Sequence, residues 1–242
     1  MGVNYNSSIV RDGLVLHLDA VNIKSFNNTT TWFDLSGLGN NATMFGTVPV
    51  TNDGGASFDF ATVTGASSPF ASLGFTFASN MIPTLGSFTL SCWIKNPPSS
   101  SAQIGLFSNA GGADGYRYGI GTNGVYTLIS GAGTVGYSEP TTNFLSALSP
   151  TLWYNVVTVF DRSGTFNSGT PRWQVYLNGV LQNNTNMVAS QPAFTSVAPG
   201  LVKSACCTLY TGKLSQFSAH NRALSTAEIQ QNFNALRGRY SL

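Results

Sequence analysis

The chain has 242 residues, a net charge of +2 and only 8% charged residues, against about 25% in ordinary globular proteins. It has no run of Lys or Arg that could form the basic stripe needed to bind a phosphate backbone, which excludes nucleic acid as a partner. No segment approaches the ~20 apolar residues of a membrane span, and the N-terminal segment has no secretory leader. We therefore expect a soluble protein that is made in a cytoplasm and does not enter a membrane.

Short apolar, β-branched and aromatic runs separated by turn residues predict about a dozen strands. In chain order the strand-like runs are 14–18, 42–47, 57–60, 70–77, 87–95, 103–108, 116–121, 125–130, 153–161, 172–177, 180–182, 207–211 and 213–220. Residues 131–151 and 183–199 are predicted to be irregular because they are polar and rich in turn residues.

Two Asn-Gly pairs predict β-hairpins. Asn178-Gly179 joins RWQVYL to VLQ, and Asn123-Gly124 joins YRYGIG to VYTLIS. Both residues of such a pair tolerate the positive φ angles of a type I′ turn. The strand at 153–161 and the hairpin at 172–182 are therefore expected to lie at the centre of the fold.

The strand FTLSCWIK alternates most clearly between its two faces. Cys92 shares its face with Phe88, Leu90 and Ile94, so we expect it in the core, with Trp93 on the opposite face. The other cysteines are Cys206 and Cys207, and an odd total excludes a fully paired framework. Buried thiols and a bridge from Cys92 to Cys206 or Cys207 both remain open.

The one convincing helical period lies at residues 225–237. Ser225 and Glu228 form a capping box, and Ile229, Phe233 and Leu236 fall on one apolar face. This face is expected to pack on a sheet. The prediction is an all-β, two-sheet antiparallel β-sandwich with one short C-terminal helix, in a single domain over 1–242 whose residues 1–13 form an N-terminal arm.

Several segments, in the same order along the chain, resemble laminin-G-like, concanavalin A-like jelly-roll domains. They are GLVLHLDAVNIKSF with WFDLSGLGNNAT, SFTLSCWIK, LWYNVVTVFD with VYLNGVL, and GKLSQFSAHNRALSTAEIQQNFNALRGRY. The resemblance covers nearly the whole chain and implies a concanavalin A-like jelly roll. Where relatives often carry Phe-Asp-Gly and an Asp-Tyr pair, this chain reads FDFATV from Phe58 to Val63, so the acidic loop of those relatives is reduced.

This version of the domain resembles those of bacteriophage virion proteins. The resemblance implies a capsid decoration protein on the surface of the virion, made in the host cytoplasm, with the major capsid protein and copies of itself as partners. The alternative is a lectin-like adhesin or tail and fibre module that binds host-surface carbohydrate. Both readings describe a non-enzymatic protein.

The carboxylates argue against a hydrolase on this fold. Retaining glycosidases need two carboxyl groups about 5–5.5 Å apart, and the only glutamates are Glu139, which stands alone, and Glu228, which the capping box uses. The two histidines, His17 and His220, are far apart in sequence and lack a third ligand, so they are expected to be structural rather than zinc-binding.

Two candidate sites remain. Tyr116 and Tyr118 on one face of a hairpin, with Tyr137 in the following loop, are predicted to form an aromatic platform for carbohydrate. Asp114 and Asp161, at strand or loop ends, are the candidate ligands for calcium, which accepts carboxylates and loop carbonyls. Their structural alternative is turn capping. No other cofactor is expected.

Overall fold

The computed structural model describes residues 8–60, 74–79, 81–83, 86–95, 104–108, 115–121, 124–131, 134–138, 148–166, 168–186, 200–201 and 210–242. The first eight strands there are β1 (Leu14–Asp19), β2 (Thr31–Trp32), β3 (Ala42–Phe45), β4 (Val50–Thr51), β5 (Ser57–Asp59), β6 (Gly74–Phe77), β7 (Phe88–Lys95) and β8 (Ile104–Ser108). The others are β9 (Gly115–Gly121), β10 (Gly124–Gly131), β11 (Thr134–Ser138), β12 (Trp153–Asp161), β13 (Arg172–Leu177), β14 (Val180–Asn186), β15 (Gly200–Leu201) and β16 (Lys213–His220). Helix α1 (Thr226–Leu236) and the 3-10 helix η2 (Arg237–Tyr240) follow.

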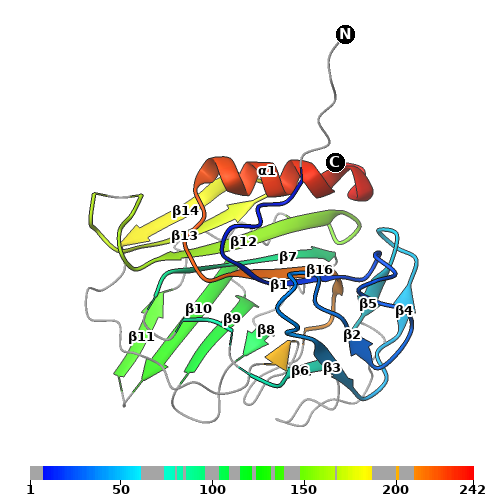
Figure 1. The fold of residues 1–242 in the computed structure, drawn as a ribbon. Helices are drawn as coiled ribbons and strands as arrows, with labels where there is room; N and C mark the ends of the chain where they lie inside the picture. The colour runs from blue at the N-terminus through cyan, green and yellow to red at the C-terminus, as the bar shows by residue number, and fades with distance from the viewer. Residues whose placement is uncertain are drawn as a thin grey trace.

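The strands form two antiparallel sheets stacked as a sandwich (Figure 1). Sheet A has the order β14-β13-β12-β7-β16-β5-β4, with β1 also paired to β16. Sheet B has the order β11-β10-β9-β8-β15-β6-β3-β2. Helix α1 lies on the outer face of sheet A, on the side away from sheet B (Figure 1). The predicted all-β sandwich with one C-terminal helix is confirmed.

Strand β7 shows how alternation builds the two sides of sheet A. Cys92 is fully buried in the same apolar cluster as Phe88, Leu90 and Ile94, between the sheets. Trp93 points to the other side and belongs to a separate cluster with the C-terminal helices. The predicted faces of β7 are therefore confirmed. Cys206 and Cys207 lie outside the described residues, so the pairing of the cysteines stays a prediction.

The central hairpin turns at Asn178 and Gly179, whose φ angles are 50° and 75°, as a type I′ turn requires. The Asn178 backbone N–H donates to the Asn155 carbonyl, and its side-chain oxygen accepts from the Asn155 N–H, both at 2.8 Å. A Cβ at position 179 would lie 3.2 Å from the Phe233 ring, so glycine also lets α1 approach the hairpin.

Helix α1 begins at the predicted capping box. The Ser225 hydroxyl accepts from the Glu228 N–H at 3.3 Å, and the Glu228 carboxylate accepts from the Ser225 N–H at 2.8 Å. Arg222 donates to both oxygens of the same carboxylate, at 2.6 and 3.2 Å. Hydrogen bonds from Arg222 lower the pKa of Glu228 to about 2, so this carboxylate is ionised and committed to the helix start.

Two predicted loops contain strand. Residues 134–138 form β11, which pairs with β10, although they were expected to be irregular. Strand β14 continues to Asn186, past the apolar run that predicted its end, because Asn183 and Asn184 keep their backbone pairing to β13. Polar side chains are tolerated there because β14 is the last strand in its sheet's order. The expected strand at 207–211 is wrong at Tyr210 and Thr211, which are not in a strand, and residues 207–209 lie outside the described part.

Candidate functional site

The predicted aromatic platform falls on strands β9 and β11 of sheet B. Tyr116 and Tyr118 lie in β9, opposite Ile129 and Thr127 of β10. Tyr137 lies in β11 rather than in a loop, and it is paired with Leu128. Strand β11 is the last in the order of sheet B, and β9 to β11 lie in the layer away from α1 (Figure 1).

The register relates the three tyrosine positions. Leu128, the partner of Tyr137, pairs on its other side with Arg117, which lies between Tyr116 and Tyr118. Directly opposed residues of an antiparallel pair occupy the same face of the sheet. The position of Tyr137 is therefore on the same face as Arg117 and on the opposite face from Tyr116 and Tyr118. The assignment of these tyrosines to carbohydrate stays a prediction.

Asp161 caps the loop that follows β12. One carboxylate oxygen accepts from the Thr165 N–H at 2.9 Å and from the Ser163 hydroxyl at 3.0 Å, and the other accepts from the Phe166 N–H at 2.9 Å. Asp161 is 1% exposed. This is the turn-capping arrangement that the sequence left open as the alternative to calcium binding. Asp114 lies outside the described residues, so the calcium prediction stays untested.

A second carboxylate joins three segments at one end of sheet A. Asp53, in the turn between β4 and β5, accepts from Lys95 and Lys213, with nitrogen to oxygen distances of 2.9 and 2.8 Å, and from the Trp153 indole at 3.0 Å. Burial acts to raise the pKa of Asp53, but these hydrogen bonds outweigh it and lower the pKa to about 2. Lys95 and Lys213 are direct partners in the β7–β16 register, and Asp53 offsets the repulsion between them.

The turn at Asp53 also requires glycine. Gly54 has a φ of 69°, and a Cβ there would lie 2.8 Å from the Trp153 ring. The carboxylate, both ammonium groups and the indole N–H thus have partners within the chain. This cluster joins β7, β12 and β16 to the turn at Asp53 and stabilises one end of the sandwich.

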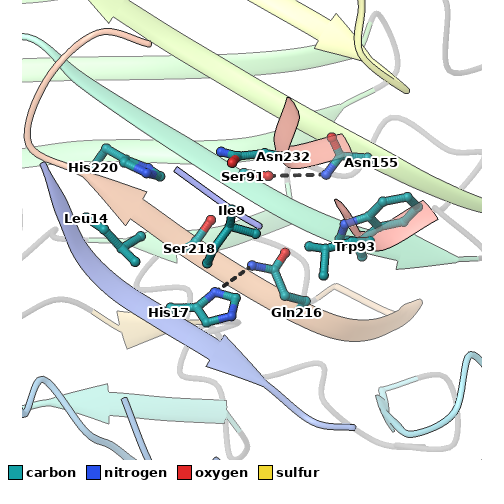
Figure 2. A pocket seen from close by; sticks show the side chains of 11 residues that line it. Ile9, Leu14, His17, Ser91, Trp93, Asn155, Gln216, Ser218, His220 and Asn232 are labelled. Atoms are coloured by element: carbon teal, nitrogen blue, oxygen red, sulfur yellow. Dashed lines mark hydrogen bonds between the residues drawn. The ribbon is translucent and has the colours of Figure 1, made fainter. Parts of the chain in front are cut away.

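A small pocket lies between sheet A and the C-terminal helix (Figure 2). Its volume is about 10 Å³, room for about one water molecule, so it cannot hold a sugar or a cofactor. His17 of β1 and His220 of β16 both line it, together with Gln216 and Ser91. The sequence predicted structural histidines but gave no sign that both line one pocket, because only the β1–β16 register places them on one face, with His17 opposite Ser218 and His220 opposite Leu14.

Both histidines are neutral near pH 7. Burial lowers the pKa of His17 to about 4, against a smaller opposing effect of Asp19. Burial likewise lowers the pKa of His220 more than its hydrogen bond to the Val10 carbonyl raises it. Within the described ranges, no three His, Cys, Asp or Glu side chains gather where they could hold a metal ion. In the same part of the chain, no helix is both long and apolar enough to cross a membrane.

Comparison with known families identifies the domain. The Laminin_G_3 family model, of the concanavalin A-like lectin/glucanases superfamily, matches residues 71–230, well over half of the 242-residue chain. The chain therefore belongs to the concanavalin A-like lectin/glucanase superfamily. A search of curated proteins found no significant match.

Solved structures share the fold across almost the whole chain. The binding domain of Paraclostridial Mosquitocidal Protein 1 superposes with a TM-score of 0.70 at 15% identity, covering 93% of this chain and 52% of the other. The binding domain of botulinum neurotoxin DC, solved with rat synaptotagmin II, gives 0.69 at 16% identity, covering 94% and 52%. A botulinum neurotoxin type C structure, described by cell entry through two ganglioside molecules, gives 0.69 at 16% identity, also covering 94% and 52%. This chain spans about half the length of these matched chains.

Proposed function

We propose that this domain is a lectin-like module that binds a cell-surface glycan without catalysing a reaction. The observation that carries the proposal is the match, over 93–94% of the chain, to toxin binding domains, one of which is described in complex with SialylT and another by its interaction with gangliosides. Membership of a superfamily that contains lectins supports it. The same superfamily contains glucanases, but Glu228 is held by Arg222 and Ser225 at the helix start and is not placed as a catalytic acid.

Strands β9 to β11 of sheet B are the binding surface in this proposal. Helix α1 covers the outer face of sheet A, and the pocket beneath it is too small for a sugar ring. Aromatic side chains at the positions of Tyr116 and Tyr118, two residues apart on one strand, suit the stacking faces of a sugar. Tyr137 is on the edge strand β11 and, by the register, belongs to the opposite face of the sheet from Tyr116 and Tyr118. Mutations can therefore test the two faces separately.

The test is binding of the whole chain, displayed multivalently, to a broad glycan array. We expect saturable binding to a subset of glycans and a loss of at least tenfold in the variant with both Tyr116→Ala and Tyr118→Ala. The single variant Tyr137→Ala is the matched control for the opposite side of the sheet. A silent array with a well-folded multivalent sample, or equal binding by the double variant, would contradict the proposed site.

The same array separates the calcium prediction from the glycan proposal. Binding that is lost in EDTA and restored by calcium, and weakened by Asp114→Asn, would support a calcium-dependent site. Asp161 is unsuited to this comparison because its replacement also removes the cap of the 162–166 loop. Binding that is unchanged in EDTA would contradict a role for calcium and leave the glycan proposal standing.

We also propose that the module is carried on the surface of a bacteriophage particle, as a capsid decoration protein that contacts the major capsid protein and copies of itself. Support comes from the sequence resemblance described above and from a surface with few charges, which suits extensive neutral contacts in an assembly. Antibodies against the recombinant domain are expected to label the heads of purified particles that encode it. Labelling of the tail alone would favour the fibre alternative, and unlabelled particles would contradict both.

A further inference from the structure

The N-terminal segment is held between a strand of sheet A and helix α1. The Val10 carbonyl lies 3.1 Å from Nε2 of His220 on β16, and the Val10 N–H donates to the Asn232 side chain of α1 at 2.7 Å. Gln231 of α1 donates to the Ser8 carbonyl at 2.8 Å. Residues 8–10 thus form a strap, and the buried His220 imidazole connects it to the sheet. Figure 2 shows Ile9 of this segment together with His220 and Asn232 around the pocket.

The hydrogen bond from His220 to Val10 forms in either protonation state of the ring, so burial rather than this bond opposes protonation. A carbonyl oxygen only accepts, so Nε2 of His220 carries the hydrogen and donates to Val10. Its Nδ1 is buried and has no hydrogen-bond partner among the described residues. A proton added to Nδ1 would create a charged ring in a residue that is 1% exposed, where no side chain or backbone atom of the described residues accepts from it.

His17 lies in the same pocket with a related constraint. Its Nδ1 is 3.2 Å from the side-chain nitrogen of Gln216, which can only donate, so Nδ1 accepts and is unprotonated. A half-turn of the Gln216 amide would let its oxygen accept from a protonated His17 instead. Within the described part of the chain, protonation therefore leaves an N–H without a protein acceptor at His220 but not at His17. Burial of the charged ring is unfavourable for both histidines.

Of the charged groups that face the two rings, five form ion pairs with one another. Around His220 these are Asp12, Glu228 and Arg222, and Arg222 pairs with both carboxylates. Around His17 they are Asp19, Arg239, Asp34 and Arg11. Asp19 pairs with Arg239 at 2.5 Å. The Asp34 carboxylate accepts from His17 N, Ser36 N, the Ser36 hydroxyl and Asn40 N.

The layer under α1 is also separate from the sandwich core. The clusters that include α1 and η2 contain side chains from the outer face of sheet A, such as Val157 and Trp93. The core between the sheets is a different cluster, centred on residues such as Phe58 and Leu90. Loss of the helix layer would therefore leave the packing between the two sheets in place.

We propose that this layer is an acid-sensitive latch: protonation of His220 and His17 releases residues 8–10 and helix α1 from the outer face of sheet A, while the sandwich stays folded. Release uncovers the aromatic side chains beneath the helix, including Trp93 and Trp153. Proton uptake by the released state drives the change, because exposed imidazoles bind protons at a higher pH than the buried ones.

The burial of His17 sets the pH window. Its pKa is lowered from 6.5 to about 4, so the released state binds a proton below about pH 6.5 that the latched state does not bind until about pH 4. The latch therefore weakens as pH falls from 6.5 to 4 and is at full strength above 6.5. This difference in the pKa of His17 between the released and latched states raises the equilibrium constant for release up to about 300-fold at low pH. The lowered pKa of His220 acts in the same direction.

Hydrogen exchange of the full chain at pH 7.0 and pH 4.5, corrected for intrinsic exchange rates, tests the latch. Amides of α1 and of the strap are expected to lose protection at least tenfold at pH 4.5, while those of β7 and β12 keep theirs. The variant His17→Gln with His220→Gln keeps amide donors and acceptors in place of the rings but cannot titrate. It should retain helix protection at both pH values. If the double variant does not fold, the single variant His17→Gln removes the ring that sets the pH window and should lose clearly less protection than the wild type.

Glu228→Gln is the matched control. The pKa of its carboxylate is lowered from 4.5 to about 2 in the folded protein, so its contribution to the helix is lost only as pH falls below about 4.5. The variant should therefore keep the wild-type loss of protection between pH 7.0 and 4.5. Three results would overturn the latch. They are unchanged helix protection in the wild-type protein, equal loss across β7, β12 and α1, and a loss in the glutamine variants that matches the wild type.

Discussion

Replacing Phe58 with alanine is expected to lower the free energy of unfolding by about 3–5 kcal/mol, the range for a fully buried Phe. Phe58 is completely buried on β5. Its ring lies 4.6 Å from that of Trp32, 4.8 Å from that of Phe26 and 4.9 Å from that of Phe75, measured between centroids. Alanine would leave a cavity between the sheets, where strands on both sides limit collapse. Urea unfolding followed by far-ultraviolet circular dichroism measures the change.

Two further variants show whether the loss of stability comes from the cavity at Phe58 or from replacing any phenylalanine. Phe58→Leu keeps most of the buried volume and is expected to cost less than Phe58→Ala. Phe166→Ala removes the same ring from a loop where the side chain is 49% exposed, and it should change the free energy by no more than about 0.5 kcal/mol. Equal unfolding midpoints for Phe58→Ala and Phe166→Ala would contradict the central place of the aromatic cluster.

The parts of the fold that the sequence predicts best depend on neighbours in sequence. The alternation around Cys92, the Asn178-Gly179 turn and the Ser225–Glu228 capping box each act within eight residues or fewer, and the structure confirms all three. Strand β11 and the end of β14 were missed because their composition is polar. Their backbone pairing to β10 and β13 outweighs local propensity at the last strand of each sheet.

The sites were less predictable because they depend on register between distant strands. Lys95 and Lys213 meet at Asp53, and His17 meets Gln216 across 199 residues of chain. No local pattern marks such pairs before β1, β7 and β16 are placed side by side. The face of the sheet on which a residue lies depends on register in the same way. Tyr137 is on the opposite face from Tyr116 and Tyr118 only because of how β10 pairs on its two sides.

Replacing Trp93 with alanine is expected to remove about 3–5 kcal/mol as well, but from the other side of sheet A. Trp93 is fully buried, with its ring stacked on Tyr240 at 4.0 Å and on Phe233 at 5.7 Å between centroids. These two rings come from η2 and α1, so the truncation removes what holds the C-terminal helices rather than what joins the sheets. Thermal unfolding gives the total loss, and hydrogen exchange shows where it falls.

The two large truncations should therefore differ in kind. Phe58→Ala is expected to lower the stability of the whole sandwich, whereas Trp93→Ala should expose α1 to exchange at pH 7 while the core strands stay protected. Trp93→Phe, which keeps a ring between Tyr240 and Phe233, is the control and should preserve most of the helix protection. If Trp93→Ala unfolds all elements together, α1 is an integral part of one cooperative unit, and no separate layer exists for acid to release. If it frees the helix alone, the boundary between the sandwich core and the helix layer is the place where this fold opens first.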